Sequence, residues 1–193
     1  MEKVTSRLAP SFLPSTAVLE MTYLCNHKCL FCSCPWENKN GKFEIRKELT
    51  TEEWKQLIAK LCSMGITSFA FTGGEPLLRK DIFEIIKFAA AQTCEHIETK
   101  NEELVTEFRP PQLYLISNGT LVNEEVLDFC KEYNVHLSMS LPGLTTYKEH
   151  TGGVGSFENI LHCFGEAKKR GMSTTVNSTT TAKNIFELYN TIA

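Results

Sequence analysis

Strand-like and helical patterns alternate along this chain, and the alternation limits its possible folds more than any other feature. Each short apolar run is followed by a helical pattern. Strands are predicted from Thr16 to Met21, Thr67 to Phe71, Gln112 to Ser117, Val135 to Ser140 and Ser173 to Ser178. Such alternation favours right-handed crossovers and an α/β fold with a parallel sheet. Periodicity alone leaves an open doubly wound sheet and an arc of a barrel as alternatives.

The predicted helices carry ordinary start and stop signals. In the first, from about Thr51 to Met64, Thr50 and Glu53 form a capping box. Asp81 and Glu84 occupy the same positions at the second helix. Three more helices are expected, one after Asn123, one from Ser156 to Gly171, and one from about Asn184 that carries Phe186, Tyr189 and Ile192.

The length of 193 residues fits one domain, which we place at 16–193 after an N-terminal extension of residues 1–15. A closed eightfold barrel takes about 250 residues, and five strand–helix units leave an open sheet edge, so the chain is expected to be a fragment truncated at its C-terminus. Two connections are long. Thr22 to Thr50 follows a strand, on the end where parallel α/β proteins place their chemistry. Gln92 to Pro111 precedes a strand and is expected to be a surface insertion at the opposite end.

The composition argues against some classes of binding partner. The chain has 20 basic and 23 acidic residues without a basic stripe, so nucleic acid is not an expected partner. It shows neither an apolar run of bilayer length nor a signal peptide, so no membrane partner and a cytoplasmic location are expected. Eight cysteines in such a chain suggest reduced thiols or metal ligands. Cys62, Cys130 and Cys163 fit small buried residues, while the environment of Cys94 stays open.

The segment CNHKCLFC spaces Cys25, Cys29 and Cys32 so that one loop can hold three corners of a cuboidal iron–sulfur cluster. Three ligands leave one iron free. A structural zinc site is the alternative, with His27 or Cys34 as the fourth ligand. Cys34 is predicted not to be a ligand, because a fourth protein ligand would close the free iron. His27 is expected to be a solvated loop residue.

The longer segment LEMTYLCNHKCLFC resembles the signature of the radical S-adenosylmethionine (radical SAM) superfamily. The resemblance implies a partial (βα) barrel of five or six parallel strands with helices outside. It also implies a 4Fe-4S cluster on Cys25, Cys29 and Cys32, whose free iron binds the methionine part of S-adenosyl-L-methionine. Phe31 matches an aromatic position that packs near the adenine.

Further motifs match the same superfamily. The run Gly73-Gly74-Glu75-Pro76 resembles its Gly-Gly-Glu-Pro motif, whose backbone and acid receive the methionine ammonium group. Cofactor contacts are implied for Ser117, Asn118, Ser140 and Asn177, and positions lining the barrel for Thr22, Ser138 and Asn177. Each strand-end residue could instead serve an ordinary turn.

The chain also departs from the superfamily pattern. Pro142 stands where many relatives have aspartate, and HTGGVGSF lacks the usual arginine, which leaves His150 or Lys148 as substitutes. His96, His136 and His162 show no ligand spacing and are expected to be ordinary surface or core residues.

The resemblance implies reductive cleavage of S-adenosylmethionine to a 5'-deoxyadenosyl radical that abstracts a substrate hydrogen. No catalytic side chain is implied beyond those that hold the cluster and cofactor. The motifs most resemble the barrels of peptide- and protein-modifying maturases, with a reductant such as a flavodoxin or ferredoxin. The alternatives are a small-molecule radical enzyme of cofactor biosynthesis and a zinc-binding interaction module.

Overall fold

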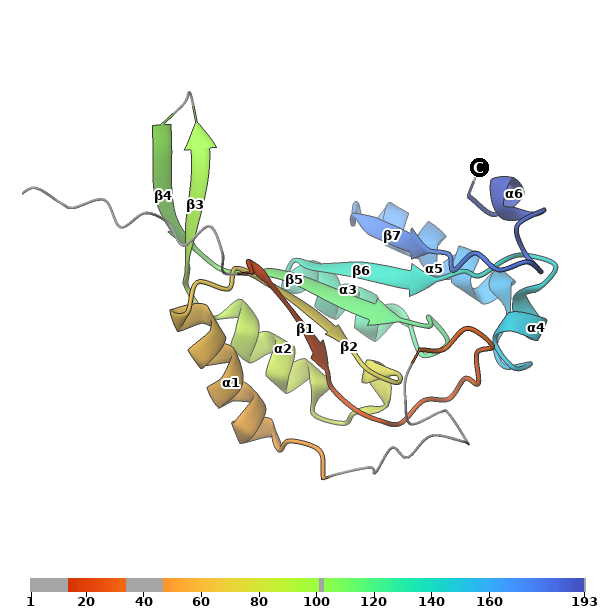
Figure 1. Cartoon of the computed structure of the whole chain (residues 1–193), viewed down its shortest axis with the longest axis horizontal. Coiled ribbons are helices and arrows are strands. Elements are labelled where there is room, and N and C mark those ends of the chain that lie inside the picture. Colours follow the sequence, from red (N-terminus) through yellow and green to blue (C-terminus); the bar gives the residue numbers. More distant parts are fainter. Residues whose placement is uncertain (1–13, 34–46, 101–102, 193) are drawn as a thin grey trace, which may run out of the picture.

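A computed structural model describes residues 14–33, 47–100 and 103–192. They form a five-stranded parallel sheet in the order β1-β2-β5-β6-β7 (Figure 1). The strands are β1 (Thr16–Glu20), β2 (Ser68–Thr72), β5 (Gln112–Ser117), β6 (Val135–Ser140) and β7 (Thr174–Asn177). All five predicted strands are confirmed, with ends displaced by at most one residue.

Helices connect successive strands of this sheet. The longer ones are α1 (Thr51–Ser63), α2 (Ile82–Ala90), α3 (Glu124–Glu132) and α5 (Phe157–Lys169). Three shorter elements follow strand ends or lie near the last described residues: the 3-10 helix η2 (Pro76–Leu78), α4 (Tyr147–His150) and α6 (Leu188–Ile192). The capping box of Thr50 and Glu53 is present, as predicted. None of the described helices combines the length and apolar character that a bilayer crossing requires.

The two faces of the sheet differ. A buried apolar row crosses four strands in register and joins the core that the long helices complete: Leu19, Phe71, Leu115 and Leu137. The adjacent register row points to the other face because side chains alternate along a strand: Val18, Ala70, Tyr114 and His136. Val18 is 64% exposed. One face therefore packs under helices, while the other is more polar and open at its β1 edge.

One predicted helix cap and one predicted helix start are wrong. Asp81 provides no side-chain cap to α2, because its carboxylate accepts hydrogen bonds from Arg79 and Thr51 instead. The last helix begins at Leu188, and Phe186 and Tyr189 are 91% and 78% exposed. Asn184 does not start it, because its side chain bonds the backbone of a turn, accepting from the Thr181 N–H and donating to the Thr179 carbonyl.

The predicted surface insertion is an antiparallel hairpin of β3 (Cys94–Lys100) and β4 (Glu103–Arg109). It projects from the sheet beside the end of α1 and leads into the start of β5 (Figure 1). Cys94 is buried, and its thiol is a hydrogen-bonding neighbour of the Cys62 thiol on α1. Burial is the largest cause that raises the pKa of Cys62, to about 12. These two thiols therefore belong to the base of the hairpin.

Candidate functional site

The three motif cysteines lie on the segment that leaves β1 at the C-terminal end of the sheet (Figure 1). Cys25 and Cys29 are half-buried and Cys32 is exposed. Within residues 14–33, 47–100 and 103–192, no group of three or more His, Cys, Asp or Glu side chains is arranged to hold a metal ion. The thiols thus share a loop without being gathered around one point. Cys34 lies outside the described residues.

The glycine turn after β2 packs directly on the start of this cysteine loop. The Gly74 N–H donates to the Thr22 carbonyl at 2.8 Å, and the Glu75 N–H donates to the Leu24 carbonyl at 2.7 Å. A Cβ at Gly74 would lie 2.1 Å from the Leu24 carbonyl oxygen. Gly73 has a φ of 133°, which favours glycine. The two glycines therefore allow backbone to meet backbone here.

Glu75 joins the glycine turn to the end of β5. It is 1% exposed, and its carboxylate accepts from the Ser117 hydroxyl at 2.9 Å, the Asn118 N–H at 2.8 Å and the Leu77 N–H at 3.2 Å. Burial raises the pKa of Glu75, and the hydrogen bonds oppose that rise. Its role as acceptor of the cofactor ammonium stays a prediction. Pro76 is also buried and begins η2.

Asn118 extends the same connection to the cysteine loop. Its side-chain amide donates to Asn26 Oδ1 at 2.7 Å, while its own Oδ1 accepts from the Thr120 N–H at 3.0 Å. Ser117 accepts from the Gly119 N–H at 2.9 Å. The predicted residues Gly73, Gly74, Glu75, Pro76, Ser117 and Asn118 therefore meet beside the loop that carries Cys25.

Ser140 and Asn177 are register partners at the ends of β6 and β7. The Asn177 amide donates to the Ser138 hydroxyl at 2.7 Å, so these two side chains form one polar pair on the open face. The Phe31 ring lies 6.0 Å from the His150 ring, centre to centre. Contacts of Phe31, Ser140 and Asn177 with a cofactor stay predictions.

Helix α4 and the residue after it also bond the cysteine loop, at points separate from the glycine turn. The Lys28 N–H donates to the Thr151 carbonyl at 3.3 Å and the Leu30 N–H to the His150 carbonyl at 3.0 Å, so the two bonds flank Cys29. Both ring nitrogens of the buried His150 contact the protein, at the Thr146 carbonyl and the Thr181 hydroxyl. His150 is therefore part of the fold here. Lys148 is exposed on α4.

The expectation that His27 is solvated is wrong. His27 is 3% exposed, and its Nε2 shares a hydrogen bond of 2.7 Å with the Thr120 hydroxyl. Burial lowers the pKa of His27, which favours the neutral ring. The sequence offered no signal for this burial, because the covering residues come from the distant β5 and α4 connections.

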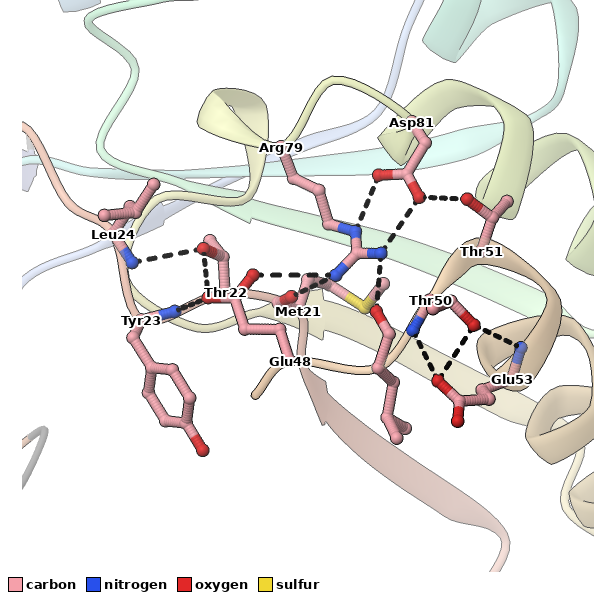
Figure 2. Close-up of polar contacts among 11 residues, drawn as sticks. Met21, Thr22, Tyr23, Leu24, Glu48, Thr50, Thr51, Glu53, Arg79 and Asp81 are labelled. Carbon is pink, nitrogen blue, oxygen red and sulfur yellow. Dashed lines mark hydrogen bonds and ion pairs between the residues drawn. The ribbon is translucent and has the colours of Figure 1, made fainter. Parts of the chain in front are cut away.

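A largely buried arginine side chain that sequence reasoning missed holds the start of the cysteine loop (Figure 2). Arg79 donates through Nη1 to the Met21 carbonyl at 3.0 Å and through Nη2 to the Leu49 carbonyl at 2.8 Å. Its Nε also donates to Asp81 Oδ1 at 2.7 Å. One guanidinium thus joins the end of β1, the residues before α1 and the start of α2, using the planar donor set of arginine.

Glu48 completes this arrangement, which we call the Arg79 clasp (Arg79, Asp81, Glu48 and Thr22). The carboxylate of Glu48 accepts from the Thr22 hydroxyl at 2.8 Å and the Tyr23 N–H at 2.6 Å, and lies 3.8 Å from Arg79 Nη1 (Figure 2). Thr22, expected to line the barrel, is buried, and its hydroxyl donates to Glu48. Arg79 and Asp81 follow the Gly-Gly-Glu-Pro run within five residues, and that proximity was the available signal.

The chemistry of the donor set fits an iron–sulfur cluster. Three thiols on one loop can supply three corners and leave a fourth position free for another ligand. The chain fixes the loop at Thr22 and Leu24, at Lys28 and Leu30, and again at Glu48. The residues present therefore suit a three-thiolate cluster held at the C-terminal end of the sheet.

Comparison with known families shows to which superfamily the chain belongs. The model of the Radical SAM superfamily matches residues 19–184. The chain belongs to the radical SAM superfamily. Members of this superfamily use a 4Fe-4S cluster and S-adenosylmethionine. Membership confirms the family resemblance of the motifs and favours an enzyme core over a zinc-binding interaction module.

Individual radical SAM relatives cover parts of this chain. A PqqA peptide cyclase from Bradyrhizobium diazoefficiens is 38% identical over 91 residues, which are 47% of this chain and 23% of the relative. An Fe-coproporphyrin III synthase from Methanosarcina barkeri is 32% identical over 166 residues, 83% of this chain and 36% of the relative. This chain thus spans between about a quarter and a third of these two proteins.

Solved radical SAM structures share the fold. The structure described as native anSMEcpe with bound AdoMet has a TM-score of 0.70 at 20% identity, covering 92% of this chain and 48% of that one. Streptococcus suis SuiB bound to the precursor peptide SuiA has a TM-score of 0.67 at 16% identity, covering 92% and 36%. The partial barrel expected from the motifs is therefore confirmed.

Proposed function

We propose that this radical SAM core abstracts a hydrogen atom from a peptide substrate. The observation that carries the proposal is the Cys25, Cys29 and Cys32 loop, bonded to the glycine turn and to the end of β5. These cysteines would hold the cluster. In this superfamily the cluster and S-adenosylmethionine together supply a 5'-deoxyadenosyl radical that takes the substrate hydrogen.

The remaining site residues orient the groups that react. Gly73, Gly74 and Glu75 would present the turn to the methionine end of the cofactor, with Ser117 and Asn118 beside it. Phe31 would cover the adenine, and Ser140 and Asn177 would bound the site at the far strands. The substrate would lie along the open face of the sheet, where polar side chains such as Ser138 can position it without reacting.

The peptide assignment is supported by sequence relatives. PqqA peptide cyclases from several bacteria match this chain, with identities between 25% and 38%. Peptide-modifying radical enzymes need an external one-electron donor, and a flavodoxin or ferredoxin would fill that role. A small-molecule substrate is the second candidate, because the Fe-coproporphyrin III synthase and AdoMet-dependent heme synthase relatives match 83% to 95% of the chain.

The first experiment tests the radical core. The chain is reconstituted anaerobically with iron and sulfide, then reduced with dithionite in the presence of S-adenosylmethionine, and 5'-deoxyadenosine is measured by chromatography. We expect a brown protein that forms 5'-deoxyadenosine. Cys29→Ala should lose both properties, whereas Cys62→Ala, which alters a thiol outside the loop, should keep them. A colourless, zinc-loaded protein would refute the proposal.

A second experiment separates the substrate classes. The reduced, cluster-loaded protein is incubated with deuterated candidate peptides or with deuterated coproporphyrin, and deuterium in 5'-deoxyadenosine is measured by mass spectrometry. Transfer from a peptide supports the peptide proposal. Transfer from the porphyrin alone would favour the small-molecule enzyme.

A further inference from the structure

A buried tyrosine lies on the short helix that holds the backbone on both sides of Cys29. Helix α4 begins at Tyr147, and the residues at its other end accept the two backbone hydrogen bonds that flank Cys29. Tyr147 is 1% exposed, and its hydroxyl makes no hydrogen bond with any described residue. An unpaired buried hydroxyl is costly, so this hydroxyl needs an acceptor that the described residues do not supply.

Polar atoms from two other segments lie near this hydroxyl, around Gly155. A Cβ at Gly155 would lie 3.1 Å from Tyr147 Oη, 3.2 Å from Thr120 Oγ1 and 3.4 Å from His27 Nε2. His27 itself sits between Cys25 and Cys29, and its backbone N–H donates to Cys25 Sγ at 3.4 Å. We call Tyr147, Thr120, His27 and Gly155 the loop floor. It is a buried or half-buried polar cluster that includes one residue of the cysteine loop, His27.

The next question is whether the Tyr147 hydroxyl acts as a hydrogen-bond donor or as an acceptor. Burial, and after it the nearby negative charge of the Cys29 thiolate, raise the pKa of Tyr147 to about 12. A phenol is protonated at neutral pH even at its ordinary pKa of about 10, so this hydroxyl can donate. Thr120 Oγ1 and His27 Nε2 bond each other, and among the described residues neither is a hydrogen-bond partner of the tyrosine hydroxyl.

We propose that Tyr147 is a positioning residue whose hydroxyl donates a hydrogen bond to sulfur on the Cys29 side of the bound cluster. The inference rests on the proposed function, since it requires Cys29 to be a cluster ligand. Hydrogen bonds to cluster sulfurs stabilise the more negative, reduced form and so raise the reduction potential. Tyr147 thereby makes the cluster easier to reduce.

The test compares Tyr147→Phe with Tyr133→Phe, a matched change on the last turn of α3, where the ring packs on Phe129 away from the cysteine loop. The wild-type protein and both variants are reconstituted with iron and sulfide, and the cluster potential is measured by spectroelectrochemistry with electron paramagnetic resonance of the reduced state. Thermal unfolding of each cluster-free protein is measured alongside. We expect a more negative potential in Tyr147→Phe alone, with a cluster-free melting temperature no lower than that of wild type.

The outcomes separate the two levels of the proposal. If the wild-type protein assembles no iron–sulfur cluster, the proposed function itself fails. If wild type and Tyr147→Phe assemble the same cluster with equal potentials, the function stands and the tyrosine inference is overturned. A lower melting temperature of cluster-free Tyr147→Phe with an unchanged potential would show that the hydroxyl only stabilises the fold, which also overturns it.

Discussion

Gly74 shows how much a single missing side chain contributes to this site. The backbone of its turn contacts the cysteine loop so closely that a Cβ would lie 2.1 Å from a carbonyl oxygen of that loop, Leu24 O. Backbone cannot yield as a flexible side chain can. Glycine is therefore required at this position by the neighbouring loop, in addition to any ligand that the turn receives.

Gly74→Ala should destabilise the protein. Displacing the Leu24 backbone to admit a methyl group should cost about 1–3 kcal/mol of unfolding free energy, as overpacking does elsewhere. The matched control is Gly165→Ala within α5, where a Cβ would meet no atom within 4 Å. Alanine there should add about 0.5–1 kcal/mol, because it favours helix. Urea unfolding of the cluster-free proteins measures both changes, and equal stability of Gly74→Ala and wild type would contradict the prediction.

At the scale of elements, short α4 connects the site to the last described part of the chain. Glu187 caps its start: the carboxylate accepts from the Thr145 N–H at 2.8 Å, the Thr145 hydroxyl at 2.7 Å and the Thr146 N–H at 3.1 Å, and also from the Thr146 hydroxyl. The other end of α4 carries the cysteine loop. A carboxylate far along the chain thus stabilises the support of Cys29.

This cap should depend on pH. Although burial opposes them, hydrogen bonds from Thr146 and Thr145 lower the pKa of Glu187 from the ordinary 4.5 to about 2. A lowered folded-state pKa contributes stability above the ordinary value, and that contribution is lost as pH falls toward about 2. Wild type should therefore exceed Glu187→Gln in stability above about pH 4.5, and the difference should shrink below it. Urea unfolding from pH 6 down to the acid limit measures it, with exposed Glu132→Gln as the control; a pH-independent difference would refute the assignment.

The Arg79 clasp is the second interaction that joins separate elements next to the cysteine loop. Lysine would keep the charge at position 79 but could not reach Met21, Leu49 and Asp81 together. Arg79→Lys should lower the unfolding free energy by about 1–3 kcal/mol and reduce the iron bound per chain after reconstitution. Arg170→Lys changes an arginine at the C-terminal end of α5 that pairs with Asp128 of α3 and Glu166 of α5, and should shift stability by less than about 1 kcal/mol. Similar losses in both variants would argue against a special role for Arg79.

The strands and the glycine turn were predictable because each depends on local pattern: apolar runs between turn signals, and glycines directly after a strand. The hairpin was missed because charges such as Glu95 and Glu107 obscure its alternation. The burial of His27 and the clasp of Arg79 with Glu48 join residues about 30 or more apart along the chain. Such pairings depend on the three-dimensional arrangement, and single-sequence patterns carry little information about them.

At the scale of the whole molecule, the candidate site and the surface hairpin lie at opposite ends of the sheet. The cysteine loop, the glycine turn and α4 gather at one end of the sheet, while the β3–β4 hairpin projects from the other (Figure 1). Within the described residues the hairpin pairs only with itself and adds no strand to the five-stranded sheet. Changes in its outer part should therefore leave the chemistry intact.

Shortening the hairpin tests this separation. His96 and Glu107 are register partners, so replacing 97–106 by Asn-Gly should close a tight two-residue turn and keep buried Cys94 and His96 in place. We expect an unchanged amount of cluster per chain and unchanged 5'-deoxyadenosine formation in the reconstituted protein. Loss of the cluster, with the far-ultraviolet circular dichroism of the fold retained, would show that the hairpin acts on the site.

The anchoring of the cysteine loop has a consequence for how metal loading couples to folding. In small metal-dependent domains the ion closes loops that the unliganded chain leaves open, so removal of the ion unfolds them. Here hydrogen bonds at Thr22, Lys28 and Glu48 already close the loop, so the entropy lost on closing it is offset within the folded protein. Iron and sulfide then need only draw three thiols together within a fixed frame, so chelation should bleach the protein while its fold survives.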